Sequence, residues 1–257
     1  MKPQDYIKHL NNKGVWSFTH TQAADFLSKD VTAAIRILRN DGRIIDPARG
    51  FYVIIPEEIS LTQRLPGDRF IDDLMKFYDV PYYVCLLTAA LYYGSSHQAP
   101  QVFQVMTNPA RRDIRVRGNK VVFHKKELVL ETPTILKNTP TGYMNLSTPE
   151  ATILDLIQFN IHIGGIDYVA TVISEMLDKL SSRKLAVTFK AYTLPIQQRA
   201  GYILEFLGFT KGMDRIWKQV MKGKPIYTPL AAHGKKDRIP KDPRWKVIVN
   251  QTIELDI

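Results

Sequence analysis

The sequence predicts an α+β protein built from two domains, residues 1–58 and residues 59–257. Two observations support this fold class. Residues 19–55 contain two short helical segments followed by two β-prone runs, whereas the rest mixes helices and short strands without strict strand–helix alternation. A length of 257 residues, of which 45% are hydrophobic, is enough for two buried cores.

The second predicted helix carries the clearest pattern. Its apolar residues recur at i, i+3, i+4 and i+7: Val31, Ala34, Ile35 and Leu38. This spacing places them on one inward face of a helix. Ser28 or Asp30 can cap the start of the helix, and Gly42 suits the left-handed position that ends it. The segment is therefore expected to form a helix of about three turns.

The neighbouring segments complete a compact unit. Thr19 or Thr21 begins the preceding helix, and an earlier helix around Tyr6 closes at Gly14. Residues 43–45 and 51–55 are predicted strands, and residues 46–50 are the turn between them. Residues 15–18 can add a third strand. Helix, turn, helix and hairpin in this order predict a winged helix-turn-helix, a fold that binds DNA but also occurs in protein–protein modules.

The polar face of the second helix holds the candidate base-reading residues. They can reach phosphates and base edges in a major groove: Lys29, Thr32, Arg36, Arg39 and Asn40. Arg49 lies at the expected tip of the hairpin. These side chains favour double-stranded DNA as the partner of residues 1–58.

The charge of the chain is unevenly distributed. The net charge is +10, but residues 1–58 carry only +1. Two later stretches concentrate the excess, residues 111–126 with +6 and residues 211–246 with +8. A solvated surface and a binding surface are both open interpretations of either stretch. The first stretch supplies a candidate surface for nucleic acid or another acidic partner: Arg111, Arg112, Arg115, Arg117, Lys120, Lys125 and Lys126.

The larger domain is expected to begin with a helix at residues 70–78 and a buried helix at 82–93. Short strands follow at 101–106, 114–117, 121–124, 128–131 and 141–145, and alternation in residues 114–117 places both arginines on one face. Thr148 and Pro149 mark a strong helix start. Later helices are expected at 168–180, 185–192 and 197–207, before a Lys/Pro-rich coil and a strand at 245–251.

Several features predict a cytoplasmic protein with no membrane segment. No run of 18 or more apolar residues is present, and the first ten residues lack the apolar core of a signal peptide. The single cysteine, Cys85, sits in an apolar run and is expected to be a small core residue.

No motif of an enzyme stands out. The six histidines show no metal-ligand spacing, and no phosphate-binding loop or nucleophile elbow is present. Glu150 and Asp155 fall on different helix faces, and Glu150 is explained by its helix end. We therefore expect neither catalysis nor a cofactor nor a metal, although a nuclease with scattered carboxylates stays an alternative: Asp68, Asp72 and Asp73.

The combination resembles the AbiEi-type antitoxins and related transcriptional regulators of type IV toxin–antitoxin systems. The resemblance rests on the N-terminal winged helix and on three segments: LLTAALYYG at 86–94 before the strand at 101–106, STPEATILDL at 147–156, and WKVIVN at 245–250. It implies an N-terminal domain that binds operator inverted repeats and represses its own operon, in a phage-defence setting. It also implies a C-terminal domain that counteracts a nucleotidyltransferase-like toxin without a stable complex. Carried over to this chain, Arg43 and Arg49 of the hairpin would contact phosphate or the minor groove.

Two other functions remain open at the level of sequence. One is a stand-alone transcriptional regulator whose C-terminal domain senses a ligand or a partner. The other is a nucleic-acid-processing enzyme targeted by the winged helix.

Overall fold

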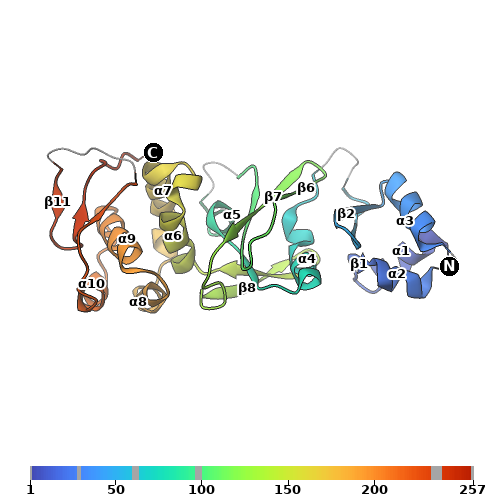
Figure 1. The fold of residues 1–257 in the computed structure, drawn as a ribbon, viewed down its shortest axis with the longest axis horizontal. Coiled ribbons are helices and arrows are strands. Elements are labelled where there is room, and N and C mark those ends of the chain that lie inside the picture. Colours follow the sequence, from blue (N-terminus) through green and yellow to red (C-terminus); the bar gives the residue numbers. More distant parts are fainter. Residues whose placement is uncertain (1, 28–29, 60–63, 96–99, 233–238, 256–257) are drawn as a thin grey trace. The chain divides into compact units, whose positions relative to one another are not determined.

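The computed structural model describes residues 2–27, 30–59, 64–95, 100–232 and 239–255. They form a mixed α+β protein (Figure 1) that divides into two compact units. Unit 1 comprises residues 1–84, 101–129 and 136–146, and unit 2 comprises residues 85–100, 130–135 and 147–257. The predicted boundary at residue 58 falls inside unit 1 and stays a prediction.

The N-terminal part of unit 1 packs three helices against a small sheet, drawn in blue in Figure 1. The helices are α1 (Pro3–Asn12), α2 (His20–Phe26) and α3 (Val31–Asn40). The strands are β1 (Ser17–Thr19), β2 (Ile44–Ala48) and β3 (Phe51–Ile54), antiparallel in the order β1-β3-β2. The predicted apolar stripe of α3 is confirmed, because Ala34, Ile35 and Leu38 are buried in the core of this part.

Local capping explains where these helices begin and end. The Thr19 side chain accepts from the amide of Gln22, whose side chain accepts from the Thr19 amide in return. Asp30 Oδ1 accepts from the amide of Ala33 at 2.9 Å and so caps α3, while Ser28 lies outside the described residues. Gly42 follows α3 with φ +67°, the left-handed conformation expected there.

The turn of the hairpin is shorter than predicted. Strand β2 continues through Pro47 to Ala48, which leaves Arg49 and Gly50 as the turn in place of residues 46–50. A register shift between Ile45 and Ala48 accommodates the proline. Proline is tolerated because β2 is an edge strand of its sheet.

The remainder of unit 1 is built on a six-stranded sheet with the order β6-β7-β5-β4-β9-β8. A short 3-10 turn, η1 (Gly67–Arg69), leads into helix α4 (Ile71–Tyr78). The strands are β4 (Tyr82–Val84), β5 (Phe103–Thr107), β6 (Ile114–Val116), β7 (Asn119–Lys125), β8 (Thr134–Thr139) and β9 (Gly142–Ser147). Strand β5 lies inside the sheet and is fully buried, not half-buried as its alternating sequence predicts.

Three predicted elements of this region are wrong. The single helix at 82–93 is in fact strand β4 followed by helix α5 (Leu86–Tyr92). Residues 128–131 form a turn, and the neighbouring strand is β8. Strand β6 ends at Val116, so Arg117, with φ +44°, lies in the turn and does not share a strand face with Arg115.

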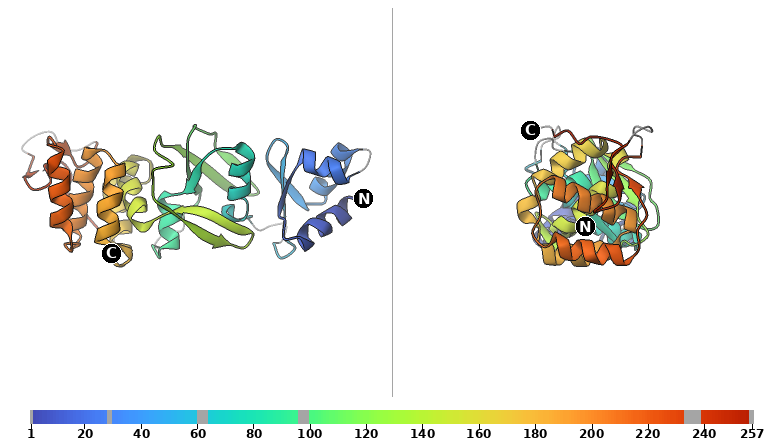
Figure 2. Two further views of the ribbon diagram at one scale, coloured as in Figure 1. Left: turned by 90° about the horizontal axis from the view of Figure 1, so that it is seen from below. Right: turned by 90° about the vertical axis from the view of Figure 1, so that its left-hand side faces the viewer.

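Unit 2 is mainly helical, and Figure 2 shows its later helices side by side. Its helices are α5, α6 (Pro149–Gln158), α7 (Gly165–Ser174), α8 (Ser182–Thr188), α9 (Leu194–Phe206) and α10 (Met213–Lys222). Short 3-10 turns join them: η2 (Asn160–His162), η3 (Leu177–Lys179) and η4 (Phe189–Ala191). The predicted start of α6 is confirmed, because Thr148 accepts from the amide of Ala151 and Pro149 is the first helical residue.

The C-terminal segment differs most from expectation. Helix α10 occupies part of the predicted coil, and the predicted strand at 245–251 shrinks to β12 (Val247–Ile248). That strand pairs with β10 (Thr228–Pro229) and β11 (Lys241–Asp242). Trp245 is fully buried beside Gly201 of α9, where even a single added Cβ would lie 2.2 Å from the indole ring.

Two further expectations concern the chain as a whole. Cys85 is buried, as predicted for a core residue. Across the described segments, no helix has the length and apolar character needed to span a membrane.

Candidate nucleic-acid interface

The outer face of α3 presents the predicted base-reading residues to solvent. Thr32, Arg36, Arg39 and Asn40 are all exposed, and Lys29 lies outside the described residues. Arg36 forms no ion pair with any residue that the structure describes, so its guanidinium is available to a ligand. Ile37, which the polar pattern of the face did not suggest, is 48% exposed there.

Two of the predicted arginines already have acidic partners. Arg39 Nη1 lies 3.3 Å from Asp46 Oδ2 of β2, and Arg43 Nη2 lies 2.8 Å from Glu57 Oε1. Arg49 is exposed in the hairpin turn, as predicted. Arg36 on α3 and Arg49 in the hairpin have no ion-pair partner among the described residues. Arg39 and Arg43 must release a carboxylate before they can bind a phosphate.

The basic stretch at residues 111–126 is less available than its charge suggests. Lys120 Nζ lies 2.8 Å from Asp113 Oδ2, and Lys125 Nζ lies 2.6 Å from Glu127 Oε1. Burial raises the pKa of Asp113, but the Lys120 ion pair and the amide of Phe123 lower it and prevail.

Two further cations of the same stretch contact tyrosines. The Arg111 guanidinium stacks 3.9 Å above the Tyr78 ring and donates to the Tyr78 carbonyl. Lys126 is only 6% exposed and donates to the Tyr83 hydroxyl at 3.0 Å, so it is not part of the predicted surface. Arg112 and Arg115 are the exposed arginines that remain.

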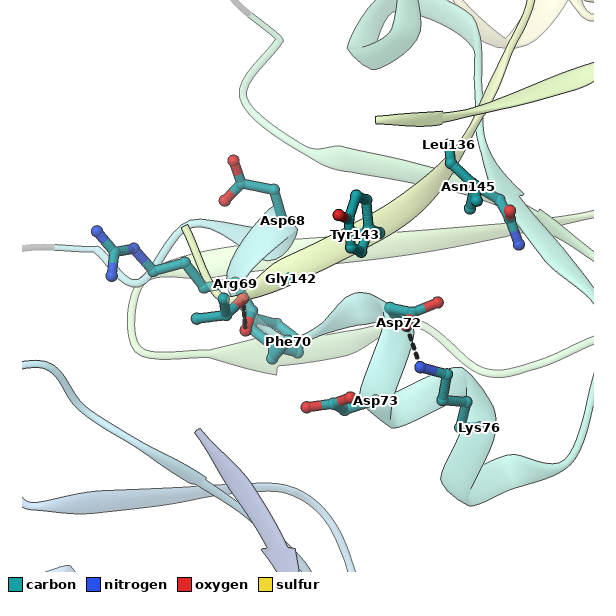
Figure 3. A pocket seen from close by; sticks show the side chains of 11 residues that line it. Asp68, Arg69, Phe70, Asp72, Asp73, Lys76, Leu136, Gly142, Tyr143 and Asn145 are labelled. Carbon is teal, nitrogen blue, oxygen red and sulfur yellow. Dashed lines mark hydrogen bonds and ion pairs between the residues drawn. The ribbon is translucent and has the colours of Figure 1, made fainter. Parts of the chain in front are cut away.

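A polar pocket of about 400 Å³ lies beside α4 in unit 1 (Figure 3). Its lining brings together the three carboxylates considered for a nuclease, Asp68, Asp72 and Asp73. Asp72 is engaged by Lys76 at 2.5 Å and by the Tyr82 hydroxyl at 2.7 Å. Burial and the bond to Asp72 raise the pKa of Tyr82, which keeps its hydroxyl a donor.

Asp73 is also bound by a neighbouring side chain, and the described residues of this pocket form no metal centre. Asp73 Oδ2 accepts from the Ser17 hydroxyl at 2.7 Å. Within the described ranges, no group of three histidine, cysteine, aspartate or glutamate side chains is placed to hold a metal ion. The pocket is thus a polar cavity whose charges are largely satisfied by neighbouring side chains.

The two carboxylates of α6 are anchors of the helix. Glu150 is 1% exposed and accepts from the Ser181 amide at 2.9 Å, and Asp155 is fully buried and accepts from the Tyr192 hydroxyl at 2.8 Å. Sequence reasoning explained Glu150 by the start of its helix and did not predict its burial. The surrounding apolar residues of α6, buried on nearly every side, were the signal that could have revealed it.

A comparison with known protein families matches one continuous segment of the chain. Residues 82–206, from β4 to the end of α9, match the AbiEi antitoxin C-terminal domain. These residues carry the C-terminal domain of the AbiEi-type antitoxin family. This AbiEi segment includes the basic stretch at 111–126 and stops before α10.

A similar fold is seen in the crystal structure of the RV2827C protein from Mycobacterium tuberculosis. The TM-score is 0.66 with 17% sequence identity, over 95% of this chain and 89% of that one. At this identity the likeness supports the fold alone. No curated protein matches the chain.

Proposed function

We propose that this protein is a DNA-binding antitoxin of the AbiEi family that represses its own operon and counteracts a nucleotidyltransferase-like toxin. In this proposal, residues 1–58 form a winged helix-turn-helix that reads operator inverted repeats in duplex DNA. Residues 59–257 form the domain that neutralises the toxin, in a functional pairing that needs no stable complex. The match of residues 82–206 to the AbiEi antitoxin C-terminal domain supports the antitoxin role.

The exposed polar face of α3 is the observation that carries the DNA-binding part. Its N-terminal half presents Thr32 and Arg36, while its apolar side is anchored in the core by Leu38. A recognition helix needs this division, because it must bury one face and offer the other to base edges. Arg49 in the hairpin turn is suited to an adjacent phosphate or minor groove.

The proposal separates into two measurable activities. A reporter placed behind the DNA upstream of this gene measures repression, and growth during co-expression with a neighbouring nucleotidyltransferase-like gene product measures rescue. The double variant Thr32→Ala/Arg36→Ala is expected to lose repression and keep rescue, since both side chains are exposed on α3. A double variant Lys8→Gln/Lys13→Gln, which removes exposed charge elsewhere in residues 1–58, is the matched control and should keep both. Failure of the wild-type chain to rescue growth would contradict the antitoxin part of the proposal.

The polar pocket favours a second candidate, a regulator that senses a small polar ligand. Its lining combines charged side chains with Tyr143, which is 58% exposed, and Asn145. Repression without rescue, relieved by a small molecule, would support this alternative over the antitoxin.

A further inference from the structure

A set of exposed cations, which we name the α8–α10 face, lies on α8, η4 and α10 of unit 2 and on the residues that flank α10. Its eight members are Arg183, Lys184, Lys190, Lys211, Arg215, Lys218, Lys222 and Lys224, all exposed. Among the residues that the structure describes, none of the eight has an ion-pair partner. Five of them lie beyond residue 206, outside the segment that matches the AbiEi domain.

The local carboxylates explain why these cations are unpaired. Residues 182–227 hold only two, Glu205 and Asp214. Arg244 binds both of them, with Nε 2.9 Å from Glu205 Oε2 and Nη2 2.6 Å from Asp214 Oδ1. The bond from Arg244 lowers the pKa of Asp214, so this carboxylate stays ionised and committed to Arg244. Both carboxylates of residues 182–227 are thus bound by Arg244, and Asp214 also interacts with Lys218 at longer range.

Helix geometry arranges the cations in rows. Arg215, Lys218 and Lys222 lie at i, i+3 and i+7, so they form one stripe along about 10 Å of α10. Gln219, beside this stripe, donates to the Ala186 carbonyl of α8 at 3.1 Å, which joins the two helices. Figure 1 shows α8 and α10 along the same edge of unit 2. The cations of α8, Arg183 and Lys184, are exposed on this neighbouring helix.

The composition of the face distinguishes between two kinds of acidic partner. Six of its eight cations are lysines. Lysine is depleted in protein–protein interfaces, whereas clustered lysine and arginine are typical of surfaces that bind nucleic-acid phosphates. A nucleic acid fits this face better than an acidic protein.

Two apolar side chains next to the cations indicate the form of that nucleic acid. Ile226 is 83% exposed and Tyr227 is 41% exposed, although their backbone is held in place. The Gln198 amide donates to the Ile226 carbonyl at 2.8 Å, and Lys246 Nζ donates to the Pro225 carbonyl at 3.0 Å. An exposed aromatic ring three residues after Lys224 in the chain suits the stacking of an unpaired base, which duplex DNA does not present.

From these observations we propose that the α8–α10 face binds single-stranded nucleic acid. The cations of α8 and α10 contact successive phosphates, and Tyr227 stacks on a base. Lys241 Nζ lies over one face of the Tyr227 ring, 5.3 Å from its centre, so the base would stack on the opposite face. This activity is separate from the reading of operator DNA by α3.

The test measures fluorescence anisotropy of the full chain with a labelled 12-nucleotide RNA, a DNA strand of the same sequence and its duplex. The triple variant Arg215→Gln/Lys218→Gln/Lys222→Gln should lose tenfold or more in affinity for the single strand and flatten the salt dependence by about 2 in log–log slope. Glutamine keeps the helix propensity of α10. Tyr227→Ala should lose about tenfold without a change of slope. The RNA and DNA strands show which sugar the face prefers.

A matched control makes the result decisive. Lys2→Gln/Lys8→Gln/Lys13→Gln removes three exposed charges near α1 and should retain the affinity of the wild type. Equal losses in the α1 and α10 triple variants, with unchanged thermal unfolding, would overturn the proposal. Binding of a non-operator duplex as tight as that of the single strand would overturn it as well.

Discussion

Replacement of Asp46 by asparagine is predicted to strengthen operator binding. The Arg39–Asp46 pair joins α3 to the hairpin at 3.3 Å, with side chains 53% and 46% exposed. A pair this exposed contributes at most about 1 kcal/mol to stability, so the fold should survive its loss. Asp46→Asn removes one repulsive charge beside the proposed DNA surface and releases Arg39 for a phosphate. One new phosphate contact should steepen the salt dependence by about 0.9 in log–log slope, and about 1 kcal/mol of added attraction is roughly a fivefold gain in affinity.

The assay is fluorescence anisotropy with a duplex from the DNA upstream of the gene, measured at several salt concentrations. Asp5→Asn, at another exposed aspartate on α1, is the matched control and should change neither affinity nor slope. Arg36→Ala should act in the opposite direction, with a loss of about 1 to 3 kcal/mol and relaxed sequence preference. Unchanged or weaker binding by the Asp46→Asn protein, with normal thermal unfolding, would refute the proposal that Arg39 on α3 lies next to DNA.

Three further predictions concern stability. Gly201→Ala should lower the unfolding free energy by about 1 to 3 kcal/mol in urea denaturation, because the new methyl would overlap the Trp245 ring. Alanine normally favours a helix, so a gain in stability would mean that the ring has room to move. Tyr192→Phe should cost about 1.5 to 3 kcal/mol by removing a donor from the buried Asp155 carboxylate, and an unchanged urea midpoint would contradict that role. Since the pKa of Asp113 is lowered on folding, its contribution is present at neutral pH and lost as pH falls through the folded value. Asp113→Asn should thus destabilise at pH 7 and have progressively less effect in acid; an effect independent of pH would count against the ion pair.

Elements with local signals were predictable from the sequence. The helices α3 and α6 combine capping residues at their starts with apolar side chains at helical spacing, and both features depend only on near neighbours in the chain. The boundary between β4 and α5 lacked such a signal. An unbroken apolar run has no period, so a buried strand followed by a buried helix looks like one long helix.

Helix α10 was missed for a different reason. Its charged residues suggested a basic coil, yet Met213, Ile216 and Val220 recur at helical spacing and are all buried. The period was therefore present in the sequence, and the high charge reflects an exposed outer face. Strand β8 had little to reveal it, because most of its residues are exposed at the edge of the sheet.

The availability of a candidate binding residue could not be read from charge counts, because ion-pair partners come from distant segments. Arg244 reaches Glu205 and Asp214, which are 39 and 30 residues away in sequence. Arg43 likewise pairs with Glu57, fourteen residues on. Such contacts depend on the tertiary fold, so the sequence predicts where cations are abundant but not which of them are uncommitted.

The two basic stretches differ in how many of their cations have partners. In residues 111–126 most of the cations are paired, stacked or buried, and Arg112 and Arg115 carry what remains exposed. Around α10 a single arginine, Arg244, binds both carboxylates, and five cations of residues 211–224 have no ion-pair partner among the described residues. Because electrostatic binding to a polyanion scales with the number of phosphates neutralised, the α8–α10 face should dominate the attraction of the chain to single-stranded nucleic acid. The α3 face, with few uncommitted arginines, is suited to sequence choice, so the two surfaces should differ in salt dependence even on the same ligand.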